Sequence, residues 1–565
     1  MSRRSGLLTV WAICIAVALV FVLFLLRKSA FYHADTTWQL YSIWSVMQPG
    51  HAPDFLSSLR PGYLLNVPAM WCFGVNLYAL RVVTYCLAVL ALAVFVYGLR
   101  RELLTSPWFP VIVLLASVCQ LRFSDYIFSY YNAPWVFLAL GLGLFWWSGR
   151  LQTLLVWCLA GLAGVALAIA SLSNLALLPA GVLAIFVVLW AAPRRQTFIC
   201  ILATVLTWVL VGGWYFDVLG VAHQLLVEHA RSTHGLFDTV LVQARKAMIN
   251  LMVLVAAVLL SWVAWYFSIR RVAMQTPAYG RRYLYFSVLI ALAFFWLLQA
   301  IIDQGSAQYN TLAVYFFMVL WAALSWVCFW PKHAPGPRRI LNSSLLIVLL
   351  FIFDHGATTQ NPYFAVFALY IPLLVVLLMV WVFSHPCQVS LWQRRVIAAV
   401  VCVMFVYPLW VQDSTILAKG FLTENQYVNP FGAEVTAHEM RLIQHAQQLY
   451  QRYDCKNKWF FAFYDETKWY VIFRRHAPFD QSWVSRVHFY PRNRAITAAN
   501  IVSVLRHQPS WCVIYGADHG WYAKGIPAKN LQPVVDYLKH HSAVRAVLGK
   551  DVADNQTVLH FWVKE

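Results

Sequence analysis

The chain has 565 residues, of which 61% are hydrophobic and only 11% are charged. Soluble domains carry charge on about 25% of their residues, so this composition excludes a disordered chain, a nucleic-acid-binding scaffold and an ordinary soluble enzyme. Several apolar runs reach the roughly 20 residues that a helix needs to cross a bilayer. The sequence therefore predicts a polytopic α-helical membrane protein with room for one further domain.

The apolar runs predict about 13 transmembrane helices, each boundary being good to a few residues. The spans are 6–26, 79–99, 106–121, 132–148, 151–171, 173–192, 197–216, 247–268, 283–302, 311–330, 340–354, 362–383 and 396–412. We interpret the first span as a retained anchor, because no small-x-small cleavage pattern follows it.

The charges predict the orientation. With a cytoplasmic N-terminus, the inside loops up to residue 412 hold 16 basic residues and the outside loops hold 8. This bias follows the positive-inside rule and accounts for much of the net charge of +20, so a nucleic-acid partner is not needed. Eight of the nine acids before residue 413 fall outside, and only Glu102 falls inside. These acids are either polar residues of short loops or part of a chemistry that faces outward.

Residues 413–565 have the composition of a soluble domain, and an odd number of spans places this domain outside. Helical periodicity covers 433–453, 495–507 and 529–541, and strands are expected at 459–464, 469–473, 511–515 and 558–563, which is an α/β pattern. The segment Phe463–Trp469 is either an acceptor-binding loop or, as we favour, a β-turn between two strands. Cys455 and Cys512 would form a disulfide in an oxidising compartment, but their spacing alone does not decide this.

The first outside loop, 27–78, is the longest before the terminal domain. Its residues 36–47 place Trp38, Tyr41 and Trp44 at helical spacing, which predicts a helix lying in the membrane interface. Asp35 comes just before this helix, in the position of an N-cap.

The chain here resembles the GT-C superfamily, which are polytopic glycosyltransferases that use polyprenyl-phosphate sugars. The resemblance rests on Asp35 at the end of the first span, the helix after it, a Gly50-x-x-x-Asp54 turn, a proline-rich return and Arg81 opening the second span. Asp125 in the second outside loop, 122–131, matches a second acid of that superfamily. The layout, with a long loop at 217–246 and a terminal domain, is similar to bacterial aminoarabinose transferases and protein mannosyltransferases.

The resemblance implies a sugar donor on undecaprenyl phosphate, inverting transfer and a cell-envelope acceptor such as lipid A, lipopolysaccharide, another glycan or a protein. A carboxylate must take the proton of the attacking hydroxyl, and cations must stabilise the departing phosphate. Asp35 is the expected base or acceptor-orienting residue, and Asp125 the expected assistant or metal ligand. Each has a structural alternative, as a helix cap and as a solvated loop acid.

The remaining candidates surround these two acids. The expected donor-phosphate ligands are Arg60, Arg81, Arg122, Arg231, His229 and His234, and each arginine is alternatively an interfacial side chain that pairs with lipid headgroups. His33, Asp54, Tyr131 and Asn132 are expected to support the site. No His-x-x-x-His or Cys-x-x-Cys spacing is present, so a divalent metal stays open.

These expectations describe a protein of the bacterial inner membrane with a transmembrane region at 1–412 and a periplasmic α/β domain at 413–565. Its partners would be the lipid-linked donor, the envelope acceptor and membrane lipids. Two other functions compete with glycosyl transfer: a flippase or transporter for lipid-linked sugars, and an envelope assembly protein of the O-antigen polymerase type. Transporters bury charges at mid-membrane, whereas here no span centre carries one.

Overall fold

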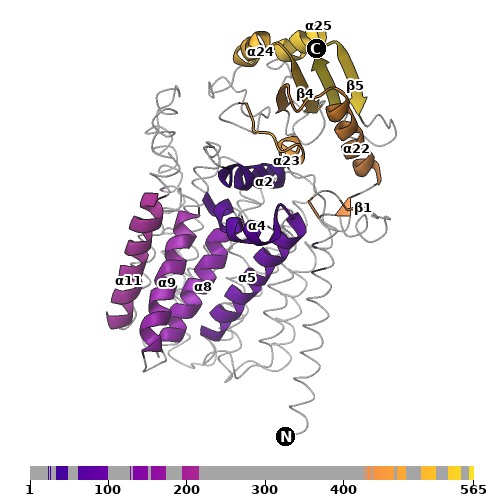
Figure 1. Ribbon diagram of the computed structural model, residues 1–565. Helices are drawn as coiled ribbons and strands as arrows, with labels where there is room; N and C mark the ends of the chain where they lie inside the picture. The colour runs from indigo at the N-terminus through magenta and orange to yellow at the C-terminus, as the bar shows by residue number, and fades with distance from the viewer. Residues whose placement is uncertain are drawn as a thin grey trace, which may run out of the picture.

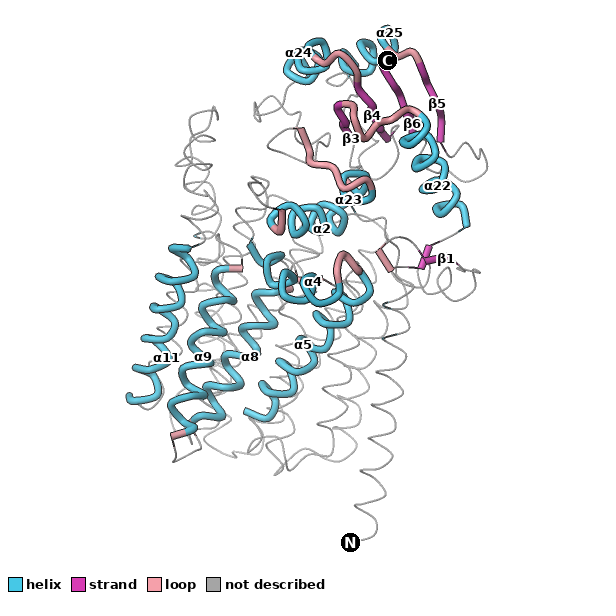
Figure 2. The backbone as a smooth tube through the Cα atoms, viewed as in Figure 1, coloured by secondary structure: helices cyan, strands magenta, loops and turns pink. Residues whose placement is uncertain are grey.

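The computed structural model describes part of the chain (Figures 1 and 2). The described residues are Leu23, Leu26, 34–48, 61–98, 127–128, 132–149, 154–173, 194–214, Met248, 427–428, 431–432, 434–435, 437–463, 467–478, 498–516, 532–548 and 559–565. Apart from isolated residues, the spans predicted at 6–26, 106–121, 173–192 and from 247 to 412 lie outside this part.

Four helices form a row in the membrane region (Figure 1). They are α5 (Leu77–Gly98), α8 (Ala133–Ser148), α9 (Leu155–Leu172) and α11 (Arg194–Thr207), the last continued by a π-helical turn, Trp208–Gly212. Within the described part of the chain, three stretches are long and apolar enough to cross a bilayer: Leu77–Gly98, Leu155–Leu172 and Arg195–Gly212. These helices confirm the corresponding predicted spans, and the protein is a polytopic membrane protein.

Small residues let the membrane helices approach closely, as is usual where lipid gives no hydrophobic drive for association. A Cβ atom added to Gly143 of α8 would lie 2.5 Å from the backbone of Phe95 in α5. Between α9 and α11, Thr204 Oγ1 donates to the carbonyl of Gly164 at 3.1 Å. Trp208 Nε1 likewise donates to Ser171 Oγ at 2.9 Å.

The first loop forms a second layer at the end of α5. It contains α2 (Ala34–Val46), a 3-10 turn (Pro61–Asn66) and α4 (Val67–Phe73). The predicted helix is confirmed, but it begins at Ala34, so Asp35 lies inside its first turn and not at an N-cap before it. Every residue from 39 to 45 is buried, because the C-terminal part of the chain covers α2 (Figure 2). The expectation of a helix with one face in the lipid interface is therefore wrong.

The C-terminal α/β unit has a four-stranded sheet in the order β3-β4-β6-β5. Its strands are β3 (Trp459–Phe463), β4 (Trp511–Gly516), β5 (Val544–Leu548) and β6 (Leu559–Lys564). β3 and β4 are parallel with Trp459 opposite Trp511, whereas β6 pairs antiparallel with both β4 and β5. Helices α22 (Ala437–Arg452), α24 (Ala498–His507) and α25 (Gln532–His541) accompany it, and a short ladder of β1 (Tyr427–Val428) and β2 (Glu434–Val435) precedes it.

Most of the predicted elements of this unit are present, but residues 469–473 are not a strand. They belong to helix α23 (Lys468–Ile472), so Phe463–Trp469 is not a turn between two strands either. The buried hydroxyl of Tyr470 donates to the carbonyl of Ala462 and accepts from its N–H, both at 2.9 Å. Ala462 lies on the edge strand β3, so the helix satisfies backbone groups that a further strand would otherwise pair.

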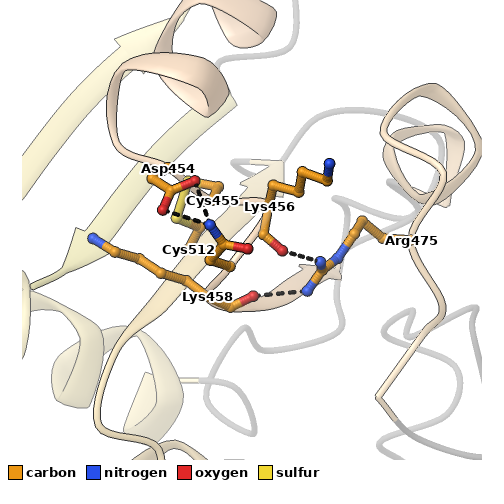
Figure 3. Close-up of a disulfide and its surroundings, with 7 residues drawn as sticks. Asp454, Cys455, Lys456, Lys458, Arg475 and Cys512 are labelled. Carbon is orange, nitrogen blue, oxygen red and sulfur yellow. Dashed lines mark hydrogen bonds between the residues drawn. A yellow bond between two sulfur atoms is a disulfide. The ribbon is translucent and has the colours of Figure 1, made fainter.

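The disulfide left open by the sequence is present between Cys455 and Cys512, whose Cα atoms are 5.8 Å apart. It joins the segment before β3 to the neighbouring strand β4 (Figure 3). The bond closes a loop of 57 residues. By the loop-closure relation this stabilises the unit by about 4 kcal/mol.

Candidate functional site

Only some of the predicted site residues belong to the described part of the chain. Arg81 and Asn132 are described fully, and Asp35 through its place in α2. Outside the described residues lie His33, Asp54, Arg60, Arg122, Asp125, Tyr131, His229, Arg231 and His234. The site is therefore built from the elements that carry or adjoin these positions.

Arg81 lies near the start of α5 and is fully buried. Its Nη1 donates to the carbonyl oxygen of Leu26, at the end of the predicted first span, at 3.3 Å. A charged side chain within a membrane helix is costly and usually marks a functional position. For Arg81 the alternative of a side chain that reaches outward to lipid headgroups is wrong, because no part of it is exposed.

The buried side-chain amide of Asn66 fixes the second loop to the first. Its Nδ2 donates to the carbonyls of Tyr63 and Phe128, each at 2.8 Å. Its Oδ1 accepts from the N–H of Phe128 at 3.0 Å. The amide thus pairs with both backbone groups of Phe128, three residues beyond Asp125. The two loops that carry the predicted acids are joined at this point.

Asn132 holds the second loop from its other side. It precedes α8 and donates from Nδ2 to the carbonyl of Ile127 at 2.8 Å. Ile127 and Phe128 are both buried, and Ile127 belongs to the same hydrophobic cluster as Tyr41 and Trp44 of α2. Asn132 is thus a tie within the loop that contains Asp125, and its supporting role at the site stays a prediction.

Helix α2, which contains Asp35, is held by α23 and the residues after it. Thr37 Oγ1 and Thr467 Oγ1 share a hydrogen bond of 2.8 Å. The hydroxyl of Tyr41 accepts from the N–H of Ala477 at 2.8 Å, and the ring of Trp44 stacks on His476 with centroids 4.7 Å apart. These contacts join residues more than 400 positions apart, so the place of Asp35 depends on the α/β unit.

The ring of Tyr41 also lies against that of Tyr470, with centroids 5.5 Å apart. Burial raises the pKa of Tyr470 well above its usual value, and the nearby Tyr41 adds to the rise. The phenol therefore stays protonated and keeps its bonds to the edge strand.

The start of α5 is fixed by the segment that leads into the α/β unit. The N–H of Leu77 donates to the carbonyl of Phe431 at 2.6 Å, and the side chain of Asn76 caps the helix by accepting from Ala79 N–H at 3.0 Å. Gly432 has φ +76, and a Cβ there would lie 2.6 Å from Asn76 Oδ1. Only glycine fits this contact. The contact fixes the start of α5, about one turn before Arg81.

Together these contacts join two loops, each of which carries an acid in its sequence, and bury a guanidinium near the start of the helix that follows the first loop. Such an arrangement suits a reaction in which a phosphate leaves and a hydroxyl loses a proton. Among the described residues no group of three His, Cys, Asp or Glu side chains could hold a metal ion.

Sequence reasoning missed Asn66, which is the main link between the loops. Asn66 precedes Val67–Pro68, and asparagine before a helix that begins with proline reads as a turn residue. Its buried amide, bonded to three backbone groups, is recognisable only once the second loop lies against it.

The fold and these features define a multi-span membrane protein with a C-terminal α/β unit docked on its first loop. Two solved structures are similar to it over 98% of both chains: ArnT, an aminoarabinose transferase, from Cupriavidus metallidurans in the apo state, and the same protein bound to undecaprenyl phosphate. The TM-scores are 0.45 and 0.42, each at 13% identity. At these values the likeness identifies neither a substrate nor a catalytic residue. No family model matches the sequence, and no curated protein matches it significantly.

Proposed function

We propose that the protein is a membrane glycosyltransferase that moves a sugar from a polyprenyl-phosphate carrier to a cell-envelope acceptor. The observation that carries the proposal is the pairing of Asn66 with Phe128, which joins the loops of Asp35 and Asp125; the buried Arg81 belongs to the helix that follows the first of these loops. A lipid-linked donor requires a site at the membrane surface, and helices α2 and α4 of the first loop lie at one end of the membrane helices (Figure 1).

In the proposed reaction the acceptor hydroxyl attacks the anomeric carbon of the donor sugar from the face opposite the phosphate. The new carbon–oxygen bond forms as the bond to the phosphate oxygen breaks, and the configuration inverts. Asp35 takes the hydroxyl proton or orients the acceptor, while Asp125 assists at the acceptor or binds a divalent metal ion. The polyprenyl phosphate leaves with the bonding electrons.

The leaving phosphate needs cations. Arg81 is the proposed ligand on the membrane side, and the other proposed ligands are Arg60, Arg122, Arg231, His229 and His234. His33 and Asp54 in the first loop and Tyr131 in the second loop are the proposed supporting residues. The proposal places the protein in the bacterial inner membrane, with a cytoplasmic N-terminus and a periplasmic α/β unit. The oxidised Cys455–Cys512 pair supports this placement of the unit.

The test compares wild type with Asp35→Asn and Asp125→Asn in detergent, using short-chain polyprenyl-phosphate donors that carry several different sugars. Wild type should transfer or hydrolyse at least one sugar, and each variant should lose roughly two orders of magnitude in rate, as expected for a positioned base. Asp536→Asn, an exposed acid on α25, is the matched control and should keep the wild-type rate.

Unchanged rates in both loop variants would return these acids to structural roles. A wild type that turns over none of the donors, but moves lipid-linked sugar across reconstituted vesicles, would replace the transferase with a flippase.

A further inference from the structure

A second candidate site lies in the α/β unit and shares no residue with the proposed transferase site. A cavity of about 540 Å³ opens where α22 and α23 end. Its walls include Gln447, Gln451, Asp454, Lys456, Phe473 and Arg474. This volume lies within the range of small-molecule sites, which is about 300–1,000 Å³.

Both helices end at this cavity in the same way. After α22, the N–H of Cys455 donates to Tyr450 and that of Asp454 to Gln451. After α23, the N–H of Arg475 donates to Tyr470 and that of Arg474 to Val471. Each pair of bonds is a Schellman motif, which places one residue in the left-handed conformation.

That left-handed residue is usually glycine, because a side chain makes the conformation unfavourable. Here it is Asp454 with φ +47 and Arg474 with φ +52. Within the described part of the chain no other non-glycine residue has a positive φ. Both strained positions therefore border one cavity, and both carry a charged side chain into its wall. Strain of this kind concentrates at ligand sites.

The wall combines three kinds of contact. The rings of Tyr450 and Phe473 stack face to face at 4.0 Å with an angle of 4°, which gives a rigid apolar pair in the wall. The amides of Gln447 and Gln451 and the carboxylate of Asp454 can bond hydroxyl groups. Lys456 and Arg474 supply two positive charges against one negative charge, so an anionic group is favoured.

The polar wall is held in place from behind. Asn457 Nδ2 donates to both carboxylate oxygens of Asp454, at 3.0 and 2.8 Å. Arg475 donates to the carbonyl oxygens of Lys456 and Lys458, and the disulfide of Cys455 anchors the same segment (Figure 3). The segment that presents Asp454 and Lys456 is thus fixed to β4 on one side and to the end of α23 on the other.

We propose that this cavity binds an anionic saccharide, with the sugar hydroxyls on the amides and Asp454 and the phosphate or carboxylate on Lys456 and Arg474. Binding is a property of the α/β unit and does not require transfer. If the proposed transferase function also holds, on which this last step rests, the saccharide is part of the acceptor.

The test measures binding of glucose 1-phosphate, glucosamine 1-phosphate and galacturonic acid to the purified full-length protein, with glucose and inorganic phosphate as separate probes. Arg474→Gly is the informative variant, because glycine suits φ +52, so the charged side chain is removed without added backbone strain. This variant should melt no lower than wild type, yet bind the anionic sugar roughly tenfold more weakly, as loss of a charge-assisted contact implies. Lys456→Gln should weaken binding similarly. Arg441→Gln, an exposed cation on α22 outside the cavity, is the matched control.

The proposal is overturned if none of the three anionic sugars binds wild type at millimolar concentration, or if binding survives in both Arg474→Gly and Lys456→Gln. Equal affinity for inorganic phosphate alone would reduce the cavity to an anion site, and equal affinity for glucose alone would remove the role of the cations. Asp35→Asn should bind the anionic sugars as wild type does. The binding proposal can therefore hold even if the transfer assay fails.

Discussion

Asn66 and Phe128 exchange two hydrogen bonds through one side-chain amide, although they are 62 residues apart. The amide thus pairs the N–H and the C=O of Phe128, as a neighbouring β-strand would. The relative placement of the two loops depends on this link.

Asn66→Ala removes this link and leaves the buried backbone groups of Phe128 without it. We expect the variant to lose at least about 2 kcal/mol of stability, since each of the two buried groups left unpaired costs about 1–3 kcal/mol. Transfer activity should fall further than stability explains, because the two acids are no longer held together. Thermal melting and the donor assay check this, with exposed Gln532→Ala of α25 as the control. Wild-type activity in Asn66→Ala would show that the loops do not act jointly.

Arg81 is expected to act on the donor phosphate and not on folding. Arg81→Met removes a donor from the carbonyl of Leu26, which costs about 1–3 kcal/mol, so the variant should melt lower but stay folded. Its rate should nevertheless fall about a hundredfold, as on loss of a donor that stabilises developing charge. Arg81→Lys should recover part of that loss. Arg545→Met, at an exposed position of β5, is the control. A slow but unfolded Arg81→Met would instead assign the guanidinium to structure.

The disulfide is expected to stabilise the α/β unit. Cys455→Ala with Cys512→Ala should lower its stability by about 4 kcal/mol, the loop-closure value for this separation. Reductant should act in the same direction on wild type and have no effect on the double variant. Cys72→Ala, an exposed free cysteine of α4, is the matched control and should melt as wild type does. Equal melting with and without reductant would mean that the bond is absent in solution.

The α/β unit should lose stability as the pH falls. His560 stacks on Tyr515 at 4.7 Å, and burial together with the charge of Lys539 lowers the pKa of His560 from 6.5. Below pH 6.5 the unfolded chain binds a proton that the folded unit does not, so stability falls from there down to the folded pKa. The melting temperature of wild type, measured from about pH 8 downward, should therefore decrease once the pH is below 6.5. The drop should be smaller in His560→Gln, and an equal drop in both would assign it to other groups.

The membrane helices were predictable because each is a single apolar run whose length the bilayer dictates. α5, α8 and α9 lie within a few residues of the predicted spans. The strands β3, β4 and β6 were predictable from short apolar runs with β-branched and aromatic residues. The same reasoning failed at α23, because Trp469, Tyr470 and Val471 have strand propensity in isolation. Tertiary contacts decide there: Tyr470 bonds Ala462, and its ring lies against Tyr41.

The candidate site was predictable only one loop at a time. The polar residues of each loop are visible in the sequence, but their joining depends on backbone groups of Phe128, which carry no sequence signal. The burial of Arg81 was equally hidden, because an arginine at the edge of an apolar run can point either way. Strand β5 was missed because it carries Arg545 and follows closely on the helix predicted at 529–541, whereas β3 is an unbroken apolar run of the same length.

The docking of α2 on α23 has a consequence for biosynthesis. Tyr41 and Trp44 are made near the beginning of the chain, and their partners Tyr470 and His476 near its end. During translation more than 400 residues are therefore synthesised between α2 and the segment that covers it. Such late pairing is slow and leaves the apolar surface of α2 open to aggregation in the meantime. The first loop is therefore covered only after the segment that contains Tyr470 and His476 has been synthesised. A truncated chain would present bare tyrosine and tryptophan rings to proteases and chaperones, whereas the finished protein hides them.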